Sequence, residues 1–100
     1  MTPLRTGVRN AWWFISRRRA FRTHGALSGT DKPVYSSGML EGDARDRFMR
    51  DRLRIDYAVL SYGTPVAWHT PEGWFVVEDK FSKTTSRHQS VIRSALSAVS

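Results

Sequence analysis

The chain has 100 residues, a net charge of +7 and no cysteine. This length fits one domain with a modest core, and the lack of cysteine excludes disulfides, thiolate zinc sites and thiol catalysis. Aromatic residues make up 12% of the chain, more than a disordered segment carries, so we expect a packed fold. Residues 11–15 form an apolar run too short for a signal peptide or a membrane span, and we expect no membrane partner.

The positive charge is concentrated near the N-terminus. Residues 1–30 contain six arginines and no acidic residue, whereas residues 31–60 contain six basic and six acidic residues. Arginine outnumbers lysine by 13 to 3. Guanidinium groups suit phosphate or carboxylate binding, but the codon bias of a GC-rich genome would give the same excess. Both explanations stay open.

The N-terminal third offers two structural interpretations. We expect one domain over residues 1–100, in which residues 1–10 lack periodicity and form a flexible basic arm. Residues 11–23 alternate in polarity and cluster tryptophan, phenylalanine and isoleucine, which favours a strand. A helix that ends near Arg19 also fits, with Trp12 and Ile15 on one face.

Turn residues and one helix follow. Glycine, serine and proline at 24–25 and 28–33 predict turns, with a short strand at 26–27 between them and an extended piece at 34–37. Residues 43–53 predict a helix with Asp43 as its acidic N-cap. The charges on its outer face indicate a solvated surface.

The C-terminal half contains the clearest signals. Residues 55–61 alternate as a strand, a bend or bulge is expected at 63–65, and strands at 66–69 and 74–77 flank a type I turn. A helix is expected from Ser86, where Gln89 completes a capping box. Its apolar stripe comprises Val91, Ile92, Ala95, Leu96 and Val99.

These elements predict an α+β fold. We expect a small antiparallel sheet of three to five strands, a C-terminal helix packed on one face and a short helix near 43–53. The exposed edges of such a sheet also allow a homodimer.

Two polar clusters are candidate binding sites for nucleic acid or another partner. In the first, arginines alternate with aromatic residues, as suits a phosphate backbone and unstacked bases; it comprises Arg17, Arg18, Arg19 and Arg22. The second precedes the last helix, whose free amides attract anions, and it comprises Lys80, Lys83, Thr84, Thr85, Ser86, Arg87 and His88. The alternatives are a basic strand with core aromatics and a plain helix cap.

A catalytic interpretation is weaker. His24, His69 and His88, with Tyr57 and nearby lysines, are residue types that a metal-independent ribonuclease uses. No two histidines have a recognisable spacing, and the chain has no glycine-rich phosphate loop. We therefore expect no catalytic residues, no metal site and no cofactor.

Two stretches carry a family resemblance. Residues 57–68, YAVLSYGTPVAW, and 80–89, KFSKTTSRHQ, resemble a family of small uncharacterised actinobacteriophage proteins with the pattern Y-x-V-x-S-Y-x-T-P-[IV]-A-W followed by S-x-T-T-S-x-H-Q. Residues 21–29, FRTHGALSG, are similar to its upstream glycine motif. Phe81 lacks the hydroxyl of the tyrosine common at that position. The resemblance implies a phage accessory protein that acts in the host cytoplasm.

Three functions follow as expectations. The first is nucleic-acid binding, to DNA or RNA, through an arginine-rich face. The second is a protein-binding module that engages and modulates a host factor. A metal-independent ribonuclease is only a minor alternative.

Overall fold

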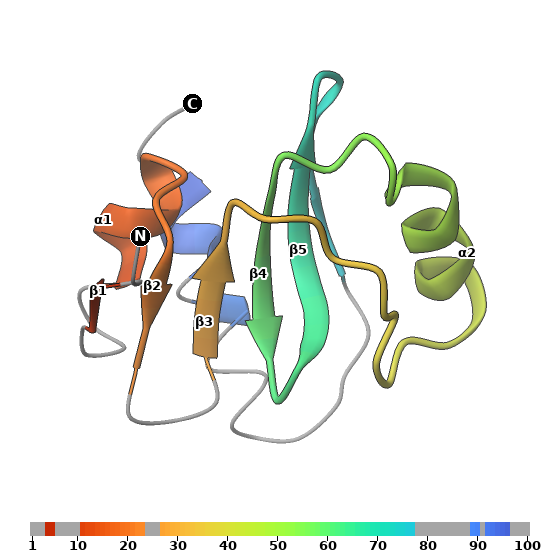
Figure 1. Cartoon of the computed structure of the whole chain (residues 1–100), viewed down its shortest axis with the longest axis horizontal. Helices are drawn as coiled ribbons and strands as arrows, with labels where there is room; N and C mark the ends of the chain where they lie inside the picture. Colours follow the sequence, from red (N-terminus) through yellow and green to blue (C-terminus); the bar gives the residue numbers. More distant parts are fainter. Residues whose placement is uncertain (1–3, 6–10, 24–26, 78–88, 91, 97–100) are drawn as a thin grey trace.

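Six strands form a single sheet in the order in which they occur along the chain (Figure 1). A computed structural model describes residues 4–5, 11–23, 27–77, 89–90 and 92–96. The strands are β1 (Leu4–Arg5), β2 (Phe21–Arg22), β3 (Leu27–Thr30), β4 (Tyr57–Ser61), β5 (Thr64–Thr70) and β6 (Gly73–Val76). Strands β2 to β6 pair antiparallel, and β1 pairs parallel to β2. The α+β prediction is confirmed, with β1 added at one edge.

Helices cover both faces of the sheet. On one face, helix α1 (Ala11–Ser16) and the helical residues 89–90 and 92–96 pack against alternate strand residues. On the other face, helix α2 (Gly42–Asp51) packs against the intervening residues, Trp68 among them. In Figure 1 the C-terminal helical segment lies behind the strands, and α2 lies beside β5 and β6. Strand alternation assigns the buried strand side chains to one of two separate cores, except at the irregularity in the β4–β5 pairing, where the consecutive Val66 and Ala67 belong to the same core.

Residues 11–16 form a helix, so the predicted strand was wrong there and the alternative helix is correct. Ala11 and Ile15 are fully buried, and their spacing places both on one helix face. Two hydrogen bonds end the helix, from Arg18 N to Ile15 O (3.1 Å) and from Arg19 N to Phe14 O (2.8 Å). This is a Schellman motif, and Arg18 holds its left-handed position with a φ of 52°.

The predicted turn at 28–33 begins later than expected, because residues 28–30 belong to β3. Gly29 pairs with Phe21 of β2. A Cβ atom at Gly29 would collide with the Tyr57 hydroxyl and the Phe21 ring. Glycine is therefore needed for close packing rather than for a turn.

The C-terminal half contains two hairpins. The interruption expected at 63–65 is a tight turn at Tyr62 and Gly63, whose φ values of 53° and 77° are those of a type I′ hairpin turn. It joins β4 and β5. The predicted hairpin of β5 and β6 is confirmed, with Thr70 opposite Gly73.

Two helix predictions are confirmed with adjusted ends. Glu41, not Asp43, is the N-cap of α2, and it makes no side-chain capping bond. In the last helix Ile92 and Ala95 are buried and Leu96 packs against them. The predicted Ser86 cap, Val91 and Val99 lie outside the described residues, and residues 33–37 have no regular secondary structure.

Asp51 fastens α2 to the sheet. The residue is 1% exposed, and its carboxylate accepts hydrogen bonds from Trp68 Nε1 (3.0 Å), Arg47 Nε (2.8 Å) and Arg54 Nη2 (3.2 Å). Burial alone would raise the pKa of Asp51, but the bonds from Trp68 and Arg47 outweigh it and lower that pKa. Arg54 also pairs with Glu72 at 2.6 Å, so the network reaches the β5–β6 turn.

The Asp51 network makes a pH-dependent prediction. The pKa of Asp51 is lower in the folded state than in the unfolded chain. The ionised carboxylate therefore stabilises the fold fully at a pH above the ordinary carboxyl pKa, and this stabilisation is lost as the pH falls through the folded-state pKa. We expect Asp51→Asn to reduce the free energy of unfolding at pH 7 by about 3 kcal/mol. Urea denaturation from pH 7 to pH 3 should show a smaller loss on acidification for the variant than for the parent.

Asp46→Asn is the matched control for that measurement. Asp46 lies exposed on the same helix, and no ion pair to it is described. The free energy of unfolding of Asp46→Asn should equal that of the parent at every pH. Equal pH profiles for Asp51→Asn and the parent would contradict the role given to the buried carboxylate.

Candidate nucleic-acid interface

Three consecutive arginines occupy the turn that ends α1. Arg17, Arg18 and Arg19 are all described, and all three are exposed. The guanidinium of Arg17 lies 4.5 Å from the ring centroid of Trp13, and Trp13 is 39% exposed. We name these four residues the arginine turn. Its backbone is fixed by the Schellman bonds, so the cations lie at a defined place rather than along a flexible arm.

Arg18 is held against the sheet by His69. Arg18 Nη1 lies 3.0 Å from His69 Nε2 and 3.1 Å from Nδ1. His69 Nδ1 in turn lies 2.7 Å from Asp56 Oδ1. The His69 side chain is 16% exposed, and it packs edge-on against Trp74. A carboxylate, an imidazole and a guanidinium from three distant parts of the chain therefore form one contact chain.

Tyr57 holds the next residue of the turn. Its hydroxyl donates a hydrogen bond to the Arg19 carbonyl oxygen at 2.7 Å. The side chain is fully buried, and burial, followed by the charge of Asp31, raises its pKa. Tyr57 is therefore a neutral donor that positions the arginine turn, and it is unavailable for the acid–base role considered from the sequence.

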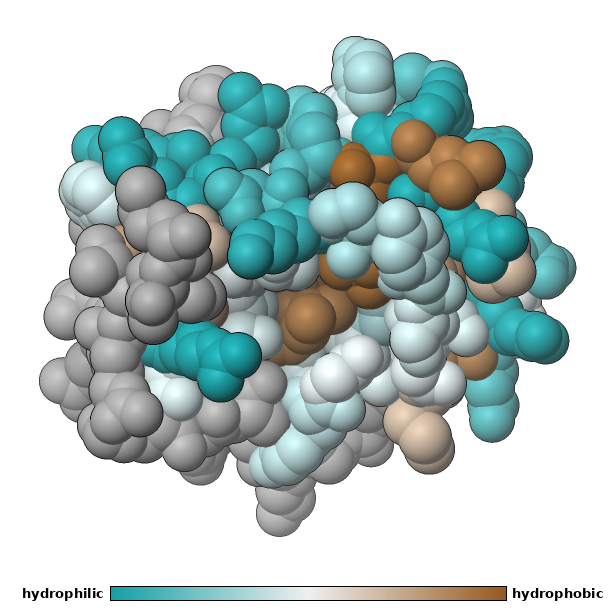
Figure 2. All heavy atoms as spheres, viewed as in Figure 1, coloured by the Kyte–Doolittle hydropathy of each residue, from teal (hydrophilic) through white to brown (hydrophobic). Residues whose placement is uncertain are grey.

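Arg22 lies apart from the other predicted arginines. Its neighbour Phe21 enters the core beside α1, so strand alternation places Arg22 on the opposite face. There it borders a hollow of 390 Å³ that also touches Ser28 and Leu60. Figure 2 shows hydrophobic atoms at the bottom of a hollow on this face, between hydrophilic side chains. The arginines expected on one face are thus divided between two.

The remaining arginines near the core are largely neutralised. Arg47, Arg50 and Arg54 each lie within 3.6 Å of a carboxylate oxygen of Asp51. Arg54 also lowers the pKa of Glu72 through its hydrogen bond. Among the described residues, none of the arginines at 17–22 forms an ion pair with a carboxylate. The uncompensated positive charge of the described chain is greatest at the arginine turn.

The second predicted cluster cannot be placed. Lys80, Lys83, Thr85, Ser86, Arg87 and His88 all lie outside the described residues, as does His24. His69 is the one histidine of the described chain, and the structure joins it to Asp56 and Arg18.

Two features escaped the sequence interpretation. Asp56 precedes β4 and comes opposite His69 only through the register in which Tyr57 pairs with His69. The helix predicted at 43–53 was expected to carry its charges, Asp51 included, on a solvated outer face, but Asp51 is buried. Its spacing of three residues from Phe48 and seven from Ala44, both buried, was the signal that places it on the inner face.

Within the described residues, no three histidine, aspartate or glutamate side chains are grouped so that they could hold a metal ion. The described helices are each too short or too polar to cross a membrane.

The fold and the arginine turn define a small basic α+β protein with a cationic surface that contacts with His69 and Tyr57 hold in place. The chain belongs to a family of unknown function (DUF8033), whose model matches residues 36–96. The chain matches no curated protein and no solved structure. The family match covers α2, β4, β5 and β6, and it begins after the arginine turn.

Tyr57→Phe tests how the turn is held. The variant keeps the ring but removes the donor of the part-buried hydrogen bond to the Arg19 carbonyl oxygen, which should reduce the free energy of unfolding by about 1 kcal/mol. Tyr62→Phe is the matched control, because Tyr62 is 65% exposed and loss of its hydroxyl should leave the free energy of unfolding unchanged. Urea denaturation of both variants makes the comparison; equal stability of the two would contradict a positioning role for the Tyr57 hydroxyl.

Proposed function

We propose that this chain is a small phage accessory protein that binds nucleic acid in the host cytoplasm through its arginine turn. The observation that carries the proposal is a run of three arginines, held in place by Tyr57 and His69 and paired with no carboxylate in the described chain. Cations of this kind bind phosphates by releasing condensed counterions. A fixed turn also loses less conformational freedom on binding than a flexible arm.

Trp13 adds a second favourable element. Its ring is partly exposed and carries the Arg17 guanidinium on one face. Unpaired bases stack on aromatic rings and on guanidinium planes, whereas duplex bases are already stacked. Single-stranded DNA or RNA is therefore the form that this surface suits best.

The phage origin and the host location rest on the resemblance of residues 57–68 and 80–89 to actinobacteriophage proteins. The family match lies in the same part of the chain. Because the arginine turn precedes that part, the binding function is proposed for this chain and not for the whole family.

Salt dependence tests the nucleic-acid proposal. We expect labelled single-stranded oligonucleotides to bind with an affinity that falls steeply with salt, and Arg17→Ala combined with Arg18→Ala to reduce the slope of log K against log salt by about 1.4. Fluorescence anisotropy between 50 and 200 mM salt, with DNA and RNA in single-stranded and duplex form, measures this slope.

The control is Arg45→Ala combined with Arg52→Ala. It removes the same charge from a different surface, since both residues belong to the α2 region. This pair should leave the slope nearly unchanged. Equal effects of the two double variants, or no binding of any oligonucleotide at low salt, would refute binding through the arginine turn.

A second candidate, metal-independent RNA cleavage, is favoured by one observation. Asp56 lies within hydrogen-bond distance of His69, an arrangement that orients a general base. If the protein cleaves RNA in the presence of a chelator, His69→Ala should abolish cleavage while circular dichroism remains unchanged. Cleavage at the parental rate by that variant would exclude His69 as the base.

Engagement of a host protein is the remaining alternative. A pull-down from actinobacterial lysate with and without nuclease separates the two binding classes. A nucleic-acid partner is lost on nuclease treatment, whereas a directly bound protein is retained.

A further inference from the structure

Strand β6 lies at one edge of the sheet that the described strands form. Val77 N donates to Val66 O at 2.9 Å, and Trp68 pairs with Phe75 two residues further along the ladder. Because inward groups alternate along an antiparallel strand, the backbone N–H and C=O groups of Trp74 and Val76 point away from β5. No described strand pairs with them.

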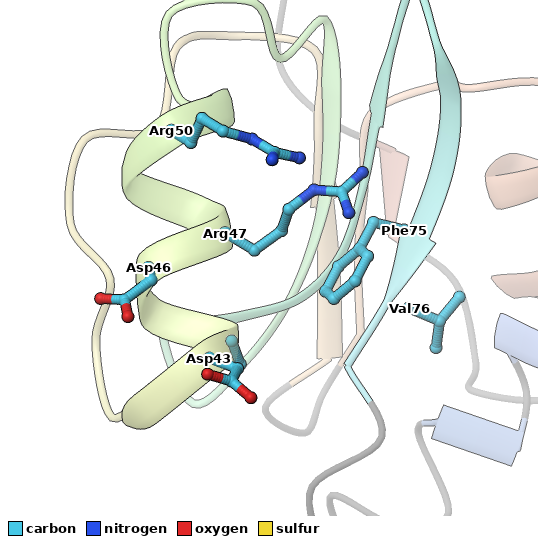
Figure 3. A pocket seen from close by; sticks show the side chains of 7 residues that line it. Asp43, Asp46, Arg47, Arg50, Phe75 and Val76 are labelled. Atoms are coloured by element: carbon cyan, nitrogen blue, oxygen red, sulfur yellow. The ribbon is translucent and has the colours of Figure 1, made fainter.

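A groove accompanies this edge. It lies between α2 and β6, has a volume of 510 Å³ and is lined by Asp43, Ala44, Asp46, Arg47, Arg50, Phe75 and Val76. Figure 3 shows the Arg47 and Arg50 side chains extending from α2 toward the strands, Arg47 close to Phe75, with Asp43 at the other end of the helix. The groove therefore has apolar side chains on the strand, an acidic end and a basic end.

We propose that the occupant of this groove is a second copy of the chain, bound by antiparallel pairing of β6 with β6. The register that uses all the outward groups places Trp74 opposite Val76 of the second copy and Val76 opposite its Trp74. Four backbone hydrogen bonds then form across a two-fold axis. Phe75 meets Phe75 of the second copy at the non-hydrogen-bonded position, where cross-strand side chains approach most closely.

The charges favour this occupant over an unrelated peptide. A two-fold axis perpendicular to the sheet reverses the direction of α2 in the second copy. Asp43 at the acidic end of the groove then faces the exposed side chain of Arg50 of the other copy, and the same match occurs twice. Such self-complementarity is what an isologous dimer requires.

The composition of β6 supports the same conclusion. Edge strands that stay monomeric usually carry a lysine, a proline or a bulge that blocks pairing. β6 reads Gly-Trp-Phe-Val, and its register with β5 shows no shift. None of these blocking devices is therefore present within the four residues.

The dimer would arrange the arginine turns in a defined way. The same two-fold axis keeps corresponding sheet faces on one side, so both arginine turns belong to the same face of a continuous sheet. The dimer itself does not depend on nucleic-acid binding, and its test uses protein alone.

The first experiment is sedimentation equilibrium of the full chain at protein concentrations up to about 100 µM, which would reveal dissociation constants in the micromolar range. We expect a mass twice the 11.5 kDa of the monomer. Val76→Pro removes an outward N–H and should give a monomer. Val76→Ala loses similar packing but keeps the N–H, and it should remain dimeric.

Charge reversal provides an independent test that leaves the β6 backbone unchanged. Asp43→Arg alone and Arg50→Glu alone each place like charges together, and each should weaken dimerisation about tenfold. Mixed in equal amounts, the two variants restore both opposite-charge contacts and should form a heterodimer. Monomeric parent protein, or a dimer indifferent to Val76→Pro and to both reversals, would overturn the proposal.

Discussion

The buried carboxylate of Asp51 is the constraint on which the arrangement of this protein depends. A charge almost fully removed from water is costly unless hydrogen bonds and opposite charges surround it. The donors that surround Asp51 come from α2, from β5 and from the residues just after α2. Asp51 is the last residue of α2, so its carboxylate finds all its hydrogen-bond donors only when the helix is docked in this position. The docked helix forms one wall of the groove beside β6. The guanidinium of Arg47, which also lies 4.6 Å from the Phe75 ring, continues the same contacts into the wall of that groove.

The same electrostatics divides the arginines by role. Arg47 and Arg54 are occupied with the internal carboxylates of Asp51 and Glu72, so they hold the fold together. Those in the arginine turn have aromatic, imidazole and carbonyl contacts that fix their place without cancelling their charge. The family match covers the first group and not the second. A shared scaffold that carries a chain-specific basic surface is the simplest interpretation of this division.

Much of the sheet could be predicted because its signals are local. The β5–β6 hairpin follows from a proline–glycine turn between apolar runs, and the α2 and C-terminal stripes follow from helical periodicity. The errors have a common cause in tertiary contacts. Alternating polarity favoured a strand at residues 11–16. The segment is helical instead, because a helix places Ala11 and Ile15 on one face, where both are buried. Gly29 suggested a turn, although its role is to make room for the Tyr57 side chain. The candidate site was predicted only in part, because Asp56 and His69 meet through strand register and Arg18 reaches His69 through a tertiary contact, and no single stretch of sequence encodes either.

The identity between strand order and chain order has a kinetic consequence. From β2 to β6 every pairing joins strands that are consecutive in the chain, and the β4–β5 and β5–β6 hairpins close over two residues each. Closing such short loops costs little chain entropy, so these hairpins can form early. The β3–β4 pairing must instead bridge the segment that contains α2, and it closes a much longer loop. The slowest step of folding is therefore expected to be the docking of the N-terminal half, with its arginine turn, onto a preformed three-stranded meander.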